Sequence, residues 1–404
     1  MKSKKLLLCV SVMSIFALSG CMKYILDGFP TVKEQFNAKY SITEPTYPTQ
    51  EDTQSVISNF DDTSTDSNYI GIRYEQLTEP QKITYDEIYT GIQNYTDTIY
   101  LSQKINQDDL EKVYNAIMNT ATIELIHTTR KYDFKYDNLT GEVSQVRPNY
   151  DISLEQRNQM IDKVKSVSND IVASVQGLDT FQTVKFFHDY IITHCDYKKS
   201  GENYNNAYGV LIDGQAVCEG YSRAFKYLCD MVNIPCELIL GDANIDHMWN
   251  LVKINGDWYH MDVTWDDPEN KGGDYIGYSY FNVTDSQIFV NHTIKDTSDF
   301  PAVTSTDMNF YKYNNLCAYT TEELYNLIYG EIYKACINGN RYVYLSVNDK
   351  STYDEAFSIL SENDWYVMYN IIKNAYSTAD YDKSINDIIC SYDDEMLTFT
   401  ITLW

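Results

Sequence analysis

The dipeptide Asn255-Gly256 is the feature that most constrains the fold, because it separates two strand-like runs. These runs are HMWNLVKI at 247–254 and DWYHMDVTW at 257–265. Asn-Gly between alternating apolar segments is the strongest short-range signal for a β-hairpin with a two-residue turn. In such a hairpin residue 254 pairs with 257, so paired residues have numbers that sum to 511. The pattern therefore predicts an antiparallel pair with a defined register.

This register brings a histidine and an aspartate together. It places Trp249 opposite Asp262 and His247 opposite Thr264. Because side chains alternate between the faces of a strand, His247, Trp249 and Asp262 are predicted on one face. His247 and Asp262 become diagonal neighbours, within reach of a hydrogen bond between carboxylate and imidazole. A carboxylate in that position orients the ring and leaves the other ring nitrogen for a nucleophile.

Cys218 stands at the start of a predicted helix. In the following run, EGYSRAFKYLCDMVNI, apolar side chains recur every three or four residues, and Pro235 then ends the pattern. Backbone N–H groups in the first turn of a helix favour a thiolate, which is the nucleophilic form of cysteine. On the helix pattern alone, a small buried cysteine that closes the helix end is an equally good interpretation.

Three strings in this region carry a family resemblance. AYGVLIDGQAVCEGYSRAF, DHMWNLV and DWYHMDVTWDDP, in this order, closely resemble the bacterial transglutaminase-like domain of the papain-like cysteine enzyme superfamily. The resemblance covers roughly residues 180–290 and includes YFNVTD at its end. It implies an α+β fold with a papain-like core, in which a helix that carries the cysteine packs on an antiparallel sheet that carries the histidine and the aspartate.

The resemblance also implies roles for individual residues. Cys218 would be the nucleophile, His247 the general base and Asp262 the residue that orients the histidine. The implied reaction is acyl transfer through a thioester, to water in a peptidase or amidase or to an amine in a cross-linking enzyme, with no cofactor and no metal. The oxyanion would bind the N–H of Cys218 and a second donor, for which Gln215 and Tyr208 are candidates. Packing around the site is expected from Trp249, Asn250, Tyr259 and Trp265.

Two alternatives to this cysteine enzyme stay open. In the hairpin, His247, His260 and Asp262 share one face and could form a metal triad. The stronger alternative is a catalytically silent scaffold that keeps the transglutaminase-like fold for surface binding or adhesion.

The charge of the chain limits its partners. The net charge is −27, and the acidic residues are spread along the sequence. A field of this sign repels nucleic acid and anionic lipid headgroups, so we expect no nucleic-acid partner. The expected partners are protein or peptide substrates, among them cell-wall or surface proteins.

The N-terminus has the pattern of an export signal. Three lysines precede the apolar run LLLCVSVMSIFAL, which is shorter than a membrane-spanning helix. The run ends in Leu-Ser-Gly-Cys21, which resembles the bacterial lipobox, where cleavage exposes a cysteine for lipid modification. The resemblance predicts an extracytoplasmic protein that Cys21 anchors to the cell membrane. An ordinary signal peptide with an incidental cysteine is the alternative.

Cysteine count and composition complete the outline. After Cys9 and Cys21, seven cysteines remain, so at least one thiol has no partner within the chain. The region after Cys21 is rich in Ser, Thr, Asp and Gln, which is typical of a flexible tether. We therefore expect a signal peptide (1–20), a tether (21–70), a small α/β module (71–150), a transglutaminase-like domain (151–298) and a C-terminal α/β module (299–404).

Overall fold

The computed structural model describes residues 4–6, 69–267, 275–296, 298–381 and 388–403. The predicted lipid-attachment site Cys21 and almost all of the predicted tether lie outside the described residues. The chain divides into two compact units, Phe60–Asn309 (the larger unit) and Phe310–Trp404 with Met1–Asn59 (the smaller unit). Both units contain helices and strands, so the predicted mixture of helix and sheet is confirmed.

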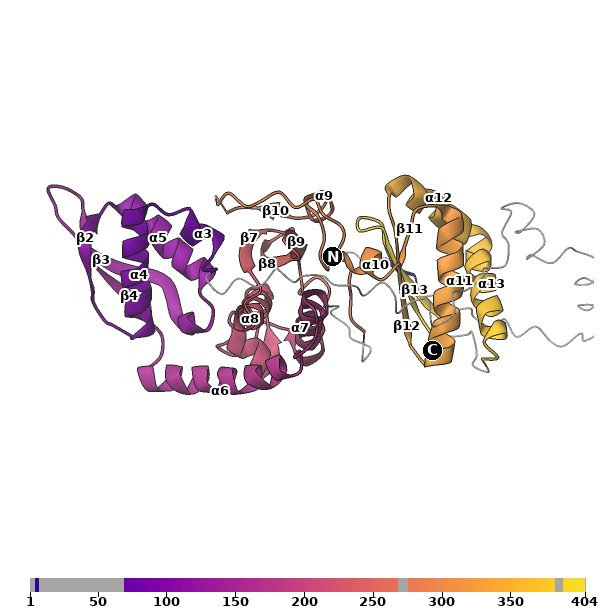
Figure 1. Ribbon diagram of the computed structural model, residues 1–404, viewed down its shortest axis with the longest axis horizontal. Coiled ribbons are helices and arrows are strands. Elements are labelled where there is room, and N and C mark those ends of the chain that lie inside the picture. The colour runs from indigo at the N-terminus through magenta and orange to yellow at the C-terminus, as the bar shows by residue number, and fades with distance from the viewer. Residues whose placement is uncertain (1–3, 7–68, 268–274, 297, 382–387, 404) are drawn as a thin grey trace, which may run out of the picture. The chain divides into compact units, whose positions relative to one another are not determined.

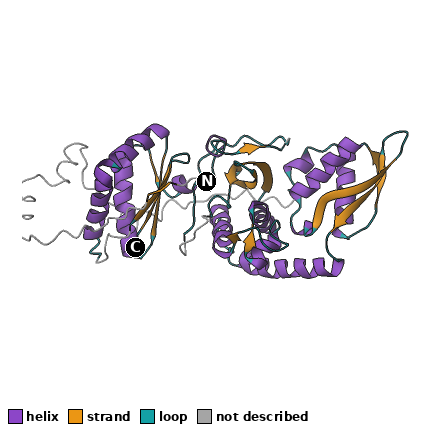
Figure 2. Ribbon diagram, turned by 180° about the vertical axis from the view of Figure 1, so that it is seen from behind, coloured by secondary structure: helices purple, strands orange, loops and turns teal. Residues whose placement is uncertain are grey.

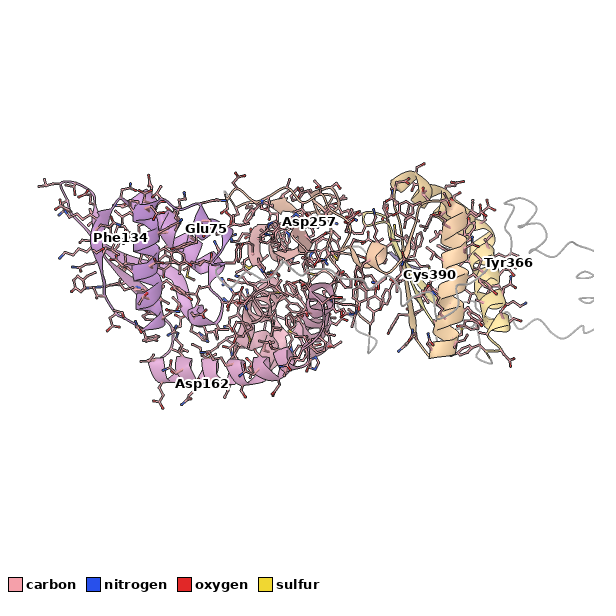
Figure 3. The ribbon with its side chains drawn as sticks, viewed as in Figure 1. Glu75, Phe134, Asp162, Asp257, Tyr366 and Cys390 are labelled. Carbon is pink, nitrogen blue, oxygen red and sulfur yellow. The ribbon has the colours of Figure 1, made fainter. Side chains whose placement is uncertain are left out.

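The N-terminal part of the larger unit is a small module of helices on a sheet. The sheet has the order β2-β4-β3 with antiparallel pairs, and helices α4 and α5 pack on it around an apolar core (Figure 1). Phe134 lies on its β3 strand (Figure 3). Its elements are α3 (Ile72–Glu75), α4 (Glu79–Gln93), β2 (Ile99–Ile105), α5 (Gln107–Thr120), η1 (Ile123–Leu125), β3 (Thr128–Tyr136) and β4 (Val143–Tyr150).

The rest of the larger unit is a core of helices around a four-stranded sheet of order β10-β7-β8-β9. Helix α6 carries Asp162 on its exposed face (Figure 3). The helices are α6 (Leu154–Ala173), α7 (Thr180–His194), the π-helical turn η2 (Gly209–Asp213), α8 (Cys218–Met231) and α9 (Asp285–Ile288). The strands are β5 (Asp196–Tyr197), β6 (Gln215–Ala216), β7 (Cys236–Asp242), β8 (Asp246–Ile254), β9 (Asp257–Met261) and β10 (Thr293–Ile294).

Helix α8 packs on the sheet and is joined to it by hydrogen bonds. The Ser222 hydroxyl donates to the carbonyl of Met248 at 2.9 Å, and the Asn250 amide donates to the carbonyl of Ser222 at 3.1 Å. Strand β8 is buried along most of its length, which is expected for a strand covered on both faces. The start of α8 is therefore held at a defined position relative to β8.

The predicted hairpin register is confirmed, but the second strand is shorter than predicted. Ile254 pairs with Asp257, and the ladder continues to Asn250 and Met261. Asn255 and Gly256 both have positive φ, at 52° and 92°, as a two-residue hairpin turn requires. The strand prediction for 262–265 is wrong, and so is the pairing of that segment with β8. Residues 263–265 lie in turns, where the N–H groups of Thr264 and Trp265 donate to the Asp262 side chain instead of the ladder, and the N–H of Asp262 itself donates to the carbonyl of Tyr280.

Two buried arginines join the module to the core. Arg223 on α8 donates to the carbonyls of Met118 and Ala121 at the C-terminal end of α5, at 2.9 and 3.0 Å. Arg73 of α3 forms an ion pair with the buried Glu237 of β7 at 2.9 Å. Each guanidinium contacts carbonyls or carboxylates that would otherwise lose hydrogen bonds on burial. The module is thus fixed against the helix that begins at Cys218.

The larger unit extends past the predicted domain end at 298. The Val303 N–H donates to Asp285 at 2.9 Å, and the Tyr259 hydroxyl contacts the Ser305 hydroxyl at 2.8 Å. The two compact units divide after Asn309.

The smaller unit is a five-stranded sheet of order β1-β13-β14-β12-β11 with helices α11 and α13 on one face (Figure 2). Strand β1 (Lys4–Leu6) lies within the predicted signal peptide, whose cleavage stays a prediction. Among the described residues, no helix has both the length and the apolar character to cross a membrane. The other elements are α10 (Phe310–Tyr313), β11 (Cys317–Ala318), α11 (Thr321–Asn338), β12 (Tyr342–Val347), α12 (Lys350–Leu360), α13 (Glu362–Thr378), β13 (Ile389–Asp393) and β14 (Thr398–Thr402).

Candidate active site

Cys218 is the first residue of α8 and lies in a cleft. The preceding Val217 has an extended backbone, and its N–H donates to the carbonyl of Tyr204 at 2.8 Å, which fixes the entry into the helix. The Cys218 side chain is half-buried, and it lines a cleft of about 1060 Å³. Because the first N–H groups of a helix have no partner within the helix, the thiol lies where backbone donors are available.

His247 lines the same cleft from the second residue of β8. Its side chain is 4% exposed, and its Nε2 atom is 2.7 Å from Oδ2 of Asp262. Nδ1 is the remaining ring nitrogen, and the Cys218 thiol contributes to the raised pKa of this ring. The Cys218 thiol of α8 and the His247 imidazole of β8 thus line one cleft, and the Asp262 carboxylate, just after β9, is bonded to that imidazole.

The Asp262 carboxylate is buried and accepts hydrogen bonds at both oxygens. Oδ1 accepts from the backbone N–H of Thr264 at 3.0 Å and of Trp265 at 3.1 Å, in the turn that ends β9. Oδ2 lies between His247 and a second imidazole, that of His292, whose Nε2 is 3.0 Å away. The orientation of this carboxylate is therefore determined by four donors.

These contacts change the protonation of the pair. Burial lowers the pKa of His247, but the charge of Asp262 and its hydrogen bond have the larger effect, with a contribution from Cys218, and raise that pKa to about 10. Burial raises the pKa of Asp262, but the charge and hydrogen bond of His247 and the hydrogen bond of His292 leave it below its usual value. The charged forms of both groups are thus favoured at neutral pH.

His292 belongs to this site but was missed in the sequence analysis. It is 1% exposed and lies 30 residues after Asp262 in the chain, immediately before β10. No spacing pattern or turn signal connects the two positions, because they meet only when β10 pairs with β7. The one available sign was the scarcity of histidine, with six in the whole chain.

The proposed metal grouping of His247, His260 and Asp262 is not the arrangement found. His260 accepts at Nδ1 from the Trp249 indole at 2.9 Å, and its Nε2 is 2.9 Å from Asp285. The pKa of His260 is lowered, chiefly by burial. This histidine holds Trp249 and Asp285 instead of joining the pair in the cleft.

A different trio, His247, Asp262 and His292, has potential ligand atoms within 4.8 Å of one another. The two Nε2 atoms are 2.7 and 3.0 Å from the same oxygen, which are hydrogen-bond distances. Ligand atoms around a tetrahedral zinc ion lie about 3.3 Å apart, because Zn–N bonds are about 2.0–2.1 Å long. The trio therefore fits a hydrogen-bonded group better than a metal centre.

The residues predicted to line the site have three different positions. The ring of Trp249 is stacked near His247 at 6.1 Å, and that of Trp265 lies 6.1 Å from it. Asn250 ties α8 to β7 through the carbonyls of Ser222 and Glu237. Tyr259 contacts Ser305. None of these four residues is among those that line the cleft.

The two candidates for the second oxyanion donor have other partners. The Tyr208 hydroxyl contacts Lys163 at 3.4 Å, and the Gln215 side chain accepts from the Ser200 hydroxyl. Neither residue lines the cleft that contains Cys218. Asn205 does line it, beside the Tyr204 carbonyl that holds the entry into α8.

Part of the lining of the cleft comes from the N-terminal module. Helix α5 contributes polar side chains, among them Asp108, Glu111 and Asn115, that line the cleft together with Cys218. No pattern in the sequence predicted that this module lines the site.

Comparison with known families supports the assignment of the domain. Residues 165–263 match the family model described as Transglutaminase-like superfamily, and this segment contains Cys218, His247 and Asp262. The chain therefore contains a transglutaminase-like domain. The search of curated proteins gives no match.

Several solved structures show a partial similarity at low identity. A structure titled as a TGase is 16% identical over 43% of this chain and 52% of its own, with a TM-score of 0.25, so this chain spans about half of its length. A putative cysteine protease from Cytophaga hutchinsonii is 14% identical over 44% of this chain and 80% of its own, at 0.24. Menin is 13% identical over 58% of each chain, also at 0.24.

Proposed function

We propose that the chain is a transglutaminase-like cysteine enzyme that acts on protein or peptide amides through Cys218, His247 and Asp262. The observation that carries the proposal is that Cys218 and His247 line one cleft while His247 is bonded to a buried carboxylate. A nucleophile, a base within reach of it and a group that orients the base are the three parts that this chemistry requires.

The proposed reaction has two steps. Nδ1 of the charged His247 holds the thiol proton in a thiolate–imidazolium pair, and the Cys218 thiolate attacks the amide carbonyl carbon to form a tetrahedral oxyanion. The carbon–nitrogen bond then breaks as His247 returns the proton to the departing amine, which leaves a thioester. Water or a primary amine next attacks the thioester carbonyl, with His247 again as base, and the Cys218 thiol is regenerated.

The oxyanion needs two donors near the sulfur. We propose the backbone N–H of Cys218, at the start of α8, and the side-chain amide of Asn205. Asn205 is supported by its position in the cleft, next to the segment whose carbonyl accepts from Val217. It replaces Tyr208 and Gln215 in this role.

The size and walls of the cleft support a peptide or protein substrate. A volume of about 1060 Å³ is at the upper end of the range for small-molecule pockets, and polar residues of α5 line it together with Cys218. A segment of polypeptide with the reacting side chain inserted would occupy such a cleft. We propose that the N-terminal module helps to select this segment.

We also propose that the enzyme is anchored outside the cytoplasm by a lipid on Cys21, as the lipobox resemblance implies. Its substrates would then be cell-wall peptides or surface proteins. Loss of the lipidated N-terminal peptide and release from membranes in a Cys21→Ala variant would test the anchor.

Selective alkylation tests whether Cys218 is an activated nucleophile. Iodoacetamide at pH 6.5 should modify Cys218 well before Cys317, the other half-buried cysteine, whose pKa is raised by burial. Replacement of His247 by Gln should abolish this preference. Equal and slow labelling of the two thiols in the natural protein would instead favour the silent scaffold.

The acceptor is tested with a primary-amine probe. The protein is incubated with casein and monodansylcadaverine, and both incorporated fluorescence and released ammonia are measured. Incorporation that depends on Cys218 indicates amine transfer, while ammonia or new peptide termini without incorporation indicate hydrolysis.

A further inference from the structure

We infer that His292 is a positioning residue of this site, which acts on His247 through the carboxylate that the two histidines share. The inference rests on the proposed function for its catalytic meaning. The geometry that carries it is a single oxygen, Oδ2 of Asp262, that lies 2.7 Å from Nε2 of His247 and 3.0 Å from Nε2 of His292.

An ionised carboxylate can only accept, so each Nε2 carries its hydrogen toward Asp262. This leaves Nδ1 of His247 to face the thiol. Nδ1 of His292 instead lies 2.5 Å from Oδ1 of Asn291, whose amide nitrogen donates to the Tyr280 hydroxyl. Its hydrogen bonds are therefore directed at the carboxylate and at the supporting structure.

His292 is held rigidly by its surroundings. Its ring centroid lies 4.5 Å from that of Trp265 and 5.1 Å from that of Trp249, and its N–H donates to the carbonyl of Ile288 at 3.0 Å. The close approach of β10 to β7 depends on Gly241. A Cβ at that position would lie 2.1 Å from the carbonyl oxygen of Thr293 and 2.6 Å from the Trp249 ring.

The consequence for Asp262 is both electrostatic and geometric. Each hydrogen-bond donor stabilises the charged form of a buried carboxylate. Without His292, Oδ2 would lose one of its two donors and would be left partly unsatisfied in a buried position. It also removes the contact that prevents Oδ2 from turning away from His247. His292 thus keeps the carboxylate charged and pointed at the ring that faces Cys218.

A matched pair of substitutions separates this role from simple packing. His292→Gln keeps an N–H donor at about the position of Nε2, whereas His292→Met has a similar length and volume but no donor. The rate of Cys218 alkylation by iodoacetamide at pH 7 is measured in the full chain, with thermal unfolding of each variant as a check on folding. We expect His292→Met to slow alkylation about tenfold to a hundredfold, the effect of one hydrogen bond to a charged group, and His292→Gln to recover most of the rate.

A double-mutant cycle tests the route of the effect. If His292 acts through Asp262, His292→Met should have almost no further effect in an Asp262→Asn protein. Equal effects of His292→Met with and without the carboxylate, or equal rates in the Gln and Met variants, would overturn the inference. Should the Met variant not fold, the Gln variant decides alone: a rate like that of Asp262→Asn would contradict the role as donor.

The failure of this inference is distinguishable from that of the proposed function. Slow labelling of Cys218 in the natural protein would contradict the proposed enzyme function, and the positioning role of His292 would be rejected with it. Fast, His247-dependent labelling that is indifferent to His292 would keep the enzyme and reject the positioning role. Stoichiometric binding of Zn²⁺ that is lost in the His292 variants would also reject it, in favour of a metal site.

Discussion

Replacement of Asp262 by Asn is the perturbation that most directly tests the site. The carboxylate is buried, with its side chain 1% exposed, and each oxygen accepts from two donors. In an asparagine one of the two positions becomes an amide NH₂ group. If that group replaces Oδ2 it meets two imidazole N–H groups, and if it replaces Oδ1 it meets two backbone N–H groups. In either orientation the amide NH₂ group faces N–H groups that also need an acceptor. The hydrogen bond between His247 and residue 262 is then rearranged or lost.

The expected magnitude follows from the interaction that is lost. A hydrogen bond to a charged group contributes about 1.5–3 kcal/mol, which is the lower limit. The rise in the pKa of His247 from 6.5 to about 10 corresponds to about 5 kcal/mol at 1.36 kcal/mol per pKa unit. This rise is a net value that includes the lowering by burial and the contribution of Cys218, so it gives the order of magnitude of the larger figure. We therefore expect the alkylation of Cys218 at neutral pH to slow by about 10-fold to about 3000-fold.

The assay is the rate of iodoacetamide labelling between pH 5 and pH 10, read for each cysteine peptide by mass spectrometry. Asp285→Asn is the matched control, since it removes a carboxylate 2.9 Å from a different buried histidine, His260, outside the cleft. That variant should label at the natural rate. An Asp262→Asn protein that folds and whose Cys218 labels at the natural rate across this pH range would refute the reasoning.

Three further outcomes are expected. Cys218→Ala should abolish fast labelling and change the free energy of unfolding by less than about 1 kcal/mol, because one small side chain replaces another at a half-buried helix start. A large loss of stability would mean that the cysteine is structural. Because folding raises the pKa of His247, the ion pair contributes fully to stability below pH 6.5, and this contribution is lost as the pH rises toward 10. Because folding lowers the pKa of Asp262, the contribution of the carboxylate is complete above about pH 4 and is lost as the pH falls below that value. The free energy of unfolding of the natural protein relative to His247→Gln should therefore be greatest between about pH 4 and 6.5, and a difference that does not vary with pH would contradict this. Arg223→Met should lower the free energy of unfolding in urea by about 2–4 kcal/mol, because two carbonyls at the end of α5 lose a buried charged donor. Arg130→Met, at a side chain that is 42% exposed, should cost less than about 1 kcal/mol, and equal losses in the two variants would be evidence against the link.

The local parts of this site were predictable from the order of the amino acids. Turn chemistry at Asn255-Gly256 and alternation along the flanking runs were enough to define the register of β8 and β9. The helical spacing after Cys218 was enough to place that residue at the start of α8. These features depend on residues a few positions apart, so they can be predicted without knowledge of the fold.

The residues that surround these parts come from distant elements and were not predictable in this way. His292 reaches Asp262 across 30 residues, and part of the lining of the cleft comes from α5, about 100 residues before Cys218 in the chain. The end of β9 at Met261 was also unpredictable, because the Asp262 side chain competes with the ladder for backbone donors. Contacts of this kind form only when elements that are distant in the chain pack together, so no local sequence pattern predicts them.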